Sequence, residues 1–230
     1  MNVLITGASR GLGLEMVRYG MEQGWRLYAC CRHPQRADSL LKTAQLANGR
    51  VSVHVADLSE LATLQALAYE LRSDALDMLI HNAGVYGSMA HQFGKVDVTS
   101  WRETFMVNTI APLKLTELLV ENLRMGQGRT LAFLSSKMGS MADNTSGGSY
   151  IYRSSKAALN AVVKSLSRDL HDDGIKVVAL HPGWVKTDMG GPNAEITPRQ
   201  SVSQMMRHLQ ALTLADSGRF IDIDGSDIPW

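Results

Sequence analysis

The first informative stretch of the chain is Asn2-Val-Leu-Ile-Thr-Gly-Ala-Ser-Arg-Gly-Leu-Gly13, in which an apolar strand runs into a glycine-rich turn and then a helix. Glycine lets the backbone turn sharply and approach a pyrophosphate, whose charge is met by free amide groups and the positive end of the helix dipole. The spacing is Gly-x3-Gly-x-Gly rather than the common Gly-x-Gly-x-x-Gly. The stretch predicts a dinucleotide site whose phosphate-binding residues are Gly7, Ser9, Arg10, Gly11, Leu12 and Gly13.

Beyond this stretch, short apolar runs alternate with longer amphipathic segments along the whole chain. Strand–helix alternation of this kind implies right-handed crossovers and a parallel sheet. Strands are predicted near residues 2–6, 26–31, 51–55, 76–81, 129–134, 175–181 and 219–223, and helices near 11–23, 35–47, 59–72, 99–124, 149–171 and 198–213. The predicted fold is a single α/β domain over residues 1–230, a Rossmann-type doubly wound parallel sheet of about seven strands with helices on both faces.

Composition excludes several classes of protein. Lys and Arg together number 23 against 22 Asp and Glu, so no general positive field attracts nucleic acid or anionic lipid. No apolar stretch approaches the length of a membrane span. A chain of 230 residues buries enough surface to fold without disulfides or a structural metal, and we expect no metal site. Its two cysteines, Cys30 and Cys31, are adjacent and suit a reducing compartment, so we expect a cytoplasmic protein.

The end of the second strand bears on the choice of cofactor. Dinucleotide folds commonly hold the adenosine ribose with an acidic residue there, but this strand ends in Arg32 and no acid precedes Asp38. A carboxylate would repel a 2′-phosphate, whereas Arg32 and Arg10 can bind one by charge-assisted hydrogen bonds. The sequence favours NADP(H) over NAD(H). The alternative is that both arginines are solvated surface residues.

Two further segments follow strands at the edge where open parallel sheets bind ligands. Asp57 and Leu58 come after the third strand, and Asp57 either accepts a hydrogen bond from the adenine amino group or forms a helix capping box with Glu60. The fourth strand ends in His81, followed by the predicted cofactor-binding residues Asn82, Ala83 and Gly84. A tight turn alone would also explain this glycine.

The candidate reacting group is Tyr152, the one tyrosine of six with a lysine, Lys156, four residues later. On a helix these positions share a face, so the ammonium lies beside the phenol. A tyrosine has an ordinary pKa of about 10, and a neighbouring cation lowers it and prepares the hydroxyl for proton exchange. The alternative is a surface tyrosine beside a solvated lysine.

Two other polar groups accompany this pair. Ser135 and Ser136 end the fifth strand, where a hydroxyl can hydrogen-bond a substrate oxygen or cap a turn. Asn108 lies within the predicted helix 99–124, where its side chain can hold a water beside Lys156 or play a structural part.

Taken together, these motifs resemble the short-chain dehydrogenase/reductase family over almost the whole chain. Thr6–Gly13 resembles its cofactor turn, Asn82–Gly84 its fourth-strand motif, and Asn108, Ser136, Tyr152 and Lys156 its catalytic set. We prefer Ser136 to Ser135 and Ser140 because it begins a Ser-x-x-Gly pattern. The segment that is similar to the family's nicotinamide-binding segment contains Pro182, Gly183, Val185 and Thr187, and the two arginines match its NADP-preferring branch.

Longer strings, among them Tyr150–Lys156, His181–Gly191 and Asp224–Trp230, are similar to the C-factor and Sniffer type of carbonyl reductase. The resemblance implies an NADPH-dependent reductase in which Tyr152 protonates a ketone or aldehyde and Lys156 contacts the nicotinamide ribose. The alternative is a C-factor-like NADP(H)-binding signalling or sensor protein with little turnover.

Three expectations concern what surrounds the site. We expect residues 183–197 to form a substrate lid with Gly190 and Gly191 as its hinge. An apolar substrate pocket is suggested by Tyr86, Phe93, Met138, Met141, Trp184 and Met189. A homo-oligomer is possible through the helices near 99–124 and 149–171, as in many members of the family.

Overall fold

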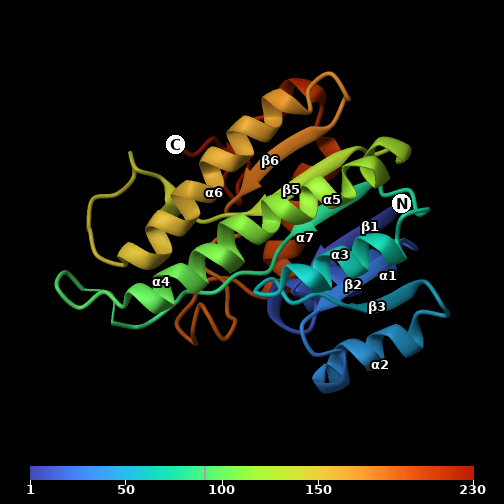
Figure 1. Cartoon of the computed structure of the whole chain (residues 1–230), viewed down its shortest axis with the longest axis horizontal. Coiled ribbons are helices and arrows are strands. Elements are labelled where there is room, and N and C mark those ends of the chain that lie inside the picture. Colours follow the sequence, from blue (N-terminus) through green and yellow to red (C-terminus); the bar gives the residue numbers. More distant parts are fainter. Residues whose placement is uncertain (91) are drawn as a thin grey trace.

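A computed structural model gives the fold of the chain and describes residues 1–90 and 92–230. Its centre is a fully parallel sheet with the strand order β3-β2-β1-β4-β5-β6-β7 (Figure 1). The strands are β1 (Asn2–Thr6), β2 (Arg26–Cys31), β3 (Val51–Val55), β4 (Met78–His81), β5 (Thr130–Leu134), β6 (Lys176–Leu180) and β7 (Phe220–Ile221). The predicted Rossmann-type fold is confirmed.

Six long helices cover the two faces of this sheet. One face carries α1 (Gly11–Glu22), α2 (Asp38–Leu46) and α7 (Pro198–Ala211). The other carries α3 (Leu61–Glu70), α5 (Ala111–Met125) and α6 (Tyr150–Asp169), which lie in front of the sheet in Figure 1. The shorter α4 (Val98–Phe105) precedes α5.

The two-sided cover explains the continuous apolar runs of central strands such as β1. Val3 and Ile5 are buried in the core under α1 and α7, whereas Leu4 between them is buried in the core under α3, α5 and α6. Successive side chains of a strand point to opposite faces, so a strand with helices on both sides needs an apolar residue at every position. Each such leucine or valine stabilises the fold by about 1.5–3 kcal/mol.

The direction of strand order reverses between β1 and β4, and this reversal positions the site. Strands β2 and β3 lie on one side of β1, and β4, the next strand in the sequence, lies on its other side. The loops after β1 and β4 therefore diverge and leave a crevice at the carboxyl ends of the strands.

Two predicted elements differ in the structure. The helix predicted over 99–124 is divided into α4 and α5 by a π-helical turn, Met106–Ile110, in which five residues rather than four separate the bonded groups. The last strand, predicted over 219–223, is reduced to Phe220 and Ile221 because the chain turns at once through Asp222 and Gly225.

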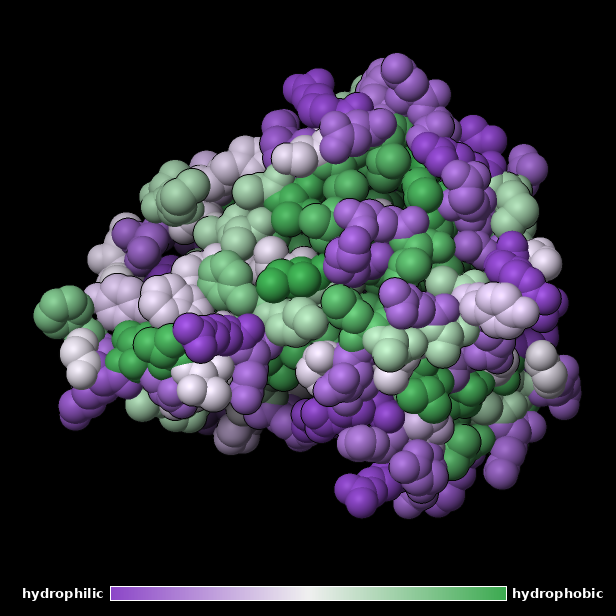
Figure 2. Space-filling view, viewed as in Figure 1, coloured by the Kyte–Doolittle hydropathy of each residue, from purple (hydrophilic) through white to green (hydrophobic). Residues whose placement is uncertain are grey.

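Figure 2 shows hydrophobic residues gathered in a band across the face on which α5 and α6 lie side by side. Leu118 and Met125 of α5 are among the large apolar side chains exposed to solvent. Pairing of these helices between subunits stays a prediction. None of the described helices is both long and apolar enough to cross a membrane.

Candidate active site

A cavity of about 460 Å³ opens at the carboxyl edge of the sheet. It runs from the turn after β2, past the glycine turn after β1, to the first turns of α6. Of the predicted cofactor-binding residues, those that line it are Gly7, Ser9, Arg10, Gly11, Leu12, Gly13, Arg32, Asp57, Leu58, Asn82, Ala83, Gly84, Tyr152, Lys156, Pro182 and Thr187.

The middle of this cavity is formed by the start of α1. Arg10 is the N-cap of α1 and has an extended backbone. Its side chain makes no capping hydrogen bond, so the first amide groups of the helix stay available to an anion. A side chain at Gly13 would lie 2.2 Å from the carbonyl oxygen of Gly7. Glycine at this position lets the helix begin directly against the turn, which gives a phosphate group access to the backbone.

The glycine turn is bound to the loop after β4. The Thr6 hydroxyl accepts hydrogen bonds from the amides of Asn82 and Ala83, both at 3.1 Å. In return the Asn82 side-chain amide donates to the carbonyls of Thr6 and Gly7, at 2.8 and 3.2 Å. These four bonds fix the two walls of the crevice at its narrowest point.

Positive charge gathers at the end of the cavity that follows β2. Arg32, His33 and Arg36 line it, and neither arginine forms an ion pair with an acid in residues 1–90 and 92–230. Burial opposes ionisation of Asp57, but bonds from Ser59 and the charges of Arg32 and His33 outweigh it and lower the Asp57 pKa. This end suits a phosphate group on the adenosine side of a dinucleotide.

Asp57 itself does not form the capping box weighed above. Its Oδ1 accepts from the amide and the hydroxyl of Ser59, at 3.0 and 2.6 Å, and Glu60 becomes the uncapped N-cap of α3. The adenine contact of Asp57 stays a prediction.

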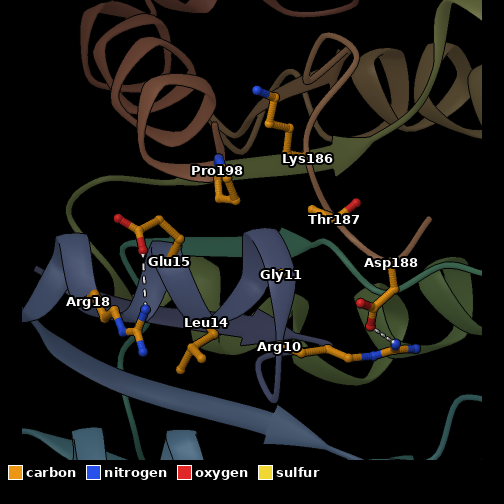
Figure 3. Close-up of a pocket in the computed structure, with 9 residues that line it drawn as sticks. All are labelled: Arg10, Gly11, Leu14, Glu15, Arg18, Lys186, Thr187, Asp188 and Pro198. Carbon is orange, nitrogen blue, oxygen red and sulfur yellow. Dashed lines mark hydrogen bonds and ion pairs between the residues drawn. The ribbon is translucent and has the colours of Figure 1, made fainter. Parts of the chain in front are cut away.

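Arg10 has a partner on the opposite wall. Its guanidinium forms an ion pair with the carboxylate of Asp188, and both side chains are exposed. Figure 3 shows the two pointing towards each other, with Thr187 above Gly11. Together with Lys186, Arg18 and the start of α7 at Pro198 they enclose a second, smaller cavity of about 290 Å³ beside the first.

At the reacting end, Tyr152 and Lys156 line the main cavity, and Ser136, which does not line it, lies next to Tyr152. Tyr152 and Lys156 lie on one face of α6, with the lysine nitrogen 5.9 Å from the centre of the tyrosine ring. The Ser136 hydroxyl lies close enough to that of Tyr152 to act on its pKa. Lys156 is buried and donates to the carbonyl oxygen of Leu134 at 2.8 Å.

The hydroxyls of the other two candidate serines are bonded to groups other than Tyr152, although Ser135 lines the cavity. Ser135 donates to Asn160 at 2.6 Å, and Ser140 donates to the carbonyl of Pro229 at 2.5 Å. Ser136, at the N-cap of a short 3₁₀ turn over Lys137–Gly139, accepts from the amide of Met138 while it faces Tyr152.

Electrostatics at this site differ from the expectation for Tyr152. Burial raises the pKa of Tyr152 to about 12, and the nearby Ser136 hydroxyl opposes that rise only in part. Burial also lowers the pKa of Lys156 to about 8. The predicted lowering of the Tyr152 pKa is therefore wrong for the protein's own groups, because burial of the phenol is the largest influence on that pKa.

Asn108 lies in the π-helical turn and is fully buried. Its side chain holds the backbone of Val85: Oδ1 accepts from the Val85 amide at 2.9 Å and Nδ2 donates to the Val85 carbonyl at 2.8 Å. A third bond runs from Nδ2 to Ser155 at 3.0 Å. The side chain thus fixes the loop after β4, which is the structural part considered for it above. Its part in holding a water beside Lys156 stays a prediction.

The loop over 183–197 is tied together near its ends. Val185 pairs with Ile196, and the Lys186 amide donates to the Ile196 carbonyl at 2.9 Å. Gly183 and Val185 do not line the main cavity. A side chain at Gly190 would lie 2.0 Å from the Val185 carbonyl oxygen, whereas Gly191 has a left-handed backbone, with φ of 75°, and open space around it. The lid and its hinge at these two glycines stay predictions.

Met189, predicted for the substrate pocket, and Ser135 also line the cavity. The sequence analysis missed other lining residues: Cys31, His33, Arg36, Ala56, Val85, Val107, Leu134 and Asp188. For His33 and Arg36 a signal was present, because basic residues cluster within four positions of Arg32. For Asp188 there was none, since its partner lies 178 residues away.

Comparison with known proteins agrees with this geometry. The family model described as short chain dehydrogenase matches residues 1–198. The C-signal protein of Myxococcus xanthus is 45% identical over 167 residues, which are 73% of this chain and all of that protein. Two solved structures superpose over the whole chain: the carbonyl reductase Sniffer of D. melanogaster, with a TM-score of 0.93 and 32% identity over 99% of that chain, and an NADPH-bound carbonyl reductase from chicken fatty liver, with 0.91 and 33% over 98%.

The fold, the glycine turn and the site therefore define an oxidoreductase of the dinucleotide-binding class. The chain belongs to the short-chain dehydrogenase family.

Proposed function

We propose that this protein is an NADPH-dependent carbonyl reductase that converts a ketone or aldehyde to an alcohol. The observation that carries the proposal is that Tyr152 and Lys156 line one end of a cavity whose middle is the uncapped start of α1, with Ser136 next to Tyr152. The likeness to carbonyl reductases, one of them NADPH-bound, supports the same class of reaction.

The residues present fit NADPH. The amides at the start of α1, together with the close approach that Gly13 allows, suit the pyrophosphate, while Arg32 and Arg36 suit a 2′-phosphate. When bound, NADPH supplies the hydride that reduces the carbonyl carbon. The roles that we assign to Pro182 and Thr187 at the nicotinamide and to Lys156 at its ribose belong to this proposal.

Tyr152 is proposed as the proton donor. A pKa of about 12 keeps its hydroxyl protonated at neutral pH, which is the form that reduction needs. The alkoxide that forms on the substrate is far more basic than a phenolate, so the proton moves to it readily. The Ser136 hydroxyl, which lies beside that of Tyr152, stabilises the same oxygen as charge develops on it.

Asn108 and Lys156 support this centre from within the protein. Lys156 is held by the Leu134 carbonyl and presents a positive charge on the Tyr152 side. Asn108 holds Val85 and so fixes the loop that faces Tyr152. The substrate is proposed to be apolar, because Met189 lines the cavity.

The test is turnover by the purified protein with NADPH and a panel of ketones and aldehydes, followed at 340 nm. Tyr152→Phe should lower turnover by at least about a hundredfold while NADPH still binds, because the ring stays and the proton is lost. Turnover like that of the wild type in this variant would refute the assignment.

A second candidate, an NADP(H)-binding signalling or sensor protein, is favoured by the 45% identity to C-signal. A sensor needs the glycine turn and not the Tyr152 hydroxyl. Binding of NADPH with no loss of absorbance across the carbonyl panel would support the sensor and exclude the reductase.

A further inference from the structure

Tyr86, in the loop after β4, has its ring stacked on that of Tyr152. The ring centres lie 4.7 Å apart and the planes are tilted by 23°. The contact joins two parts of the fold that are distant in sequence, the β4 loop and α6. Tyr86 is also half-buried, so one face of the Tyr152 ring is covered by another aromatic side chain.

The loop places Tyr86 firmly because its neighbours on both sides are held. Val85 is bound by Asn108 through its amide and its carbonyl. At Gly87 the backbone is left-handed, with φ of 82°, and an added side chain would lie 2.7 Å from Thr104 and 2.8 Å from Ile151 of α6. The chain at Tyr86 is therefore pressed against α6 with little freedom to withdraw.

The hydroxyl of Tyr86 is fixed as well. It is hydrogen-bonded to Ser149 at 2.8 Å, and Ser149 is the N-cap of α6. Ser149 adopts left-handed backbone angles, φ 46° and ψ 38°, which are uncommon for a residue other than glycine. The ring of Tyr86 thus spans from the start of α6 to Tyr152, one turn further along the same helix.

From these contacts we propose that Tyr86 is a positioning residue, which holds the ring of Tyr152 in the orientation from which it donates its proton. The role rests on the proposed reductase function. A tyrosine ring turns about two bonds, and a stacked partner restricts that motion without occupying the hydroxyl. Ser136 lies beside the hydroxyl end, and the stack with Tyr86 holds the ring face of the donor.

The experiment compares Tyr86→Leu, which removes the ring, with Tyr86→Phe, which keeps it. The control is Tyr150→Leu, the same change at an exposed tyrosine at the start of α6. We expect Tyr86→Leu to lower kcat by about three- to tenfold, the size that loss of one aromatic pair permits, with KM unchanged within about twofold. Tyr86→Phe should keep most of kcat, and Tyr150→Leu all of it.

Three results would overturn the proposal. They are an unchanged kcat in Tyr86→Leu, equal losses in Tyr86→Phe and Tyr86→Leu, and a rise in KM with kcat unchanged. The last would make Tyr86 a wall of the substrate pocket instead. Retained NADPH binding in Tyr86→Leu shows that a loss of kcat is not a loss of folding.

A measurement without turnover separates this proposal from the proposed function. In protein labelled with 3-fluorotyrosine, the ¹⁹F signal of Tyr152 is assigned by its disappearance in Tyr152→Phe. A stacked ring shifts that signal, so Tyr86→Leu should move it while Tyr86→Phe leaves it close to the wild-type position. If the signal does not move in Tyr86→Leu, the stack is refuted, even where no carbonyl is reduced at all.

Discussion

His81, at the end of β4, is a buried histidine held in its neutral form. Nε2 contacts the hydroxyl of Thr116 at 2.9 Å, and since that hydroxyl donates to the Pro112 carbonyl, Nε2 carries the proton. The ring stacks on Phe133 with centres 4.6 Å apart, and Nδ1 has no partner in the described part of the chain. Burial lowers the His81 pKa to about 3.

Because the His81 pKa is lowered by burial, we expect the folded protein to lose stability in mild acid. The unfolded chain takes up a proton near pH 6.5 and the folded protein near pH 3, so the free energy of unfolding falls as pH drops through that window. Between pH 7.5 and 5 the loss from His81 is about 2 kcal/mol. Urea unfolding at several pH values should show this slope in the wild type and lose it in His81→Gln.

Thr116→Val is the matched control, because it removes the bond and keeps the histidine. We expect it to lower the free energy of unfolding at every pH and to leave the dependence of that free energy on pH unchanged. A slope that survives in His81→Gln would assign the acid sensitivity to another group.

At the scale of elements, the loop before α7 meets the glycine turn through Arg10 and Asp188. If Arg10 contacts the cofactor phosphate, Asp188 competes for the same guanidinium. We therefore expect Asp188→Asn to raise the affinity for NADPH by about two- to fivefold, the range for an exposed ion pair. Fluorescence titration at low salt measures this.

In an Arg10→Ala background, Asp188→Asn should not raise the affinity for NADPH, since the guanidinium for which Asp188 and the phosphate compete is already absent. A lower affinity in Asp188→Asn would show instead that the ion pair holds the loop over the bound cofactor.

Some helices and strands could be predicted from the sequence and others could not. Strand positions were predictable because a two-sided sheet requires continuous apolar runs, as in Val3–Ile5. The π-helical turn at Asn108 was not predictable from the sequence. It differs from an α-helix by one residue in the spacing of its hydrogen bonds, and its amino-acid composition does not distinguish it.

The same limit applies within the site. The glycine turn, Ser136 and the Tyr152–Lys156 pair follow local motifs. The contacts of Tyr86 with Tyr152 and of Asp188 with Arg10 join residues that are distant in the sequence. No motif or residue spacing predicts these contacts.

For the whole molecule, the positive end of the cavity predicts a preference among dinucleotides. A ligand present at a hundred times its Kd stabilises a protein by about 2.7 kcal/mol, which for a chain of this size raises Tm by about 5 °C or more. We expect NADPH to give such a shift at a concentration where NADH gives little. Thermal unfolding followed by fluorescence measures both.

Arg32→Ala is the control for this preference. It should bring the NADPH shift down towards that of NADH and leave the NADH shift as it was. Equal shifts with NADPH and NADH in the wild type would contradict the assignment of Arg32 to a 2′-phosphate.

The central place of β1 in the sheet has a consequence for how the chain reaches this structure during synthesis. Both neighbours of β1 come later in the sequence, and the bond from the Asn2 amide to Asp77, at 2.7 Å, closes a loop of 75 residues. Such distant pairings lose much chain entropy before they gain contacts, so folding is slow for a chain of this size. The crevice between β1 and β4 cannot form until β4 has left the ribosome, and a nascent chain shorter than that exposes β1 as an unpaired, aggregation-prone strand.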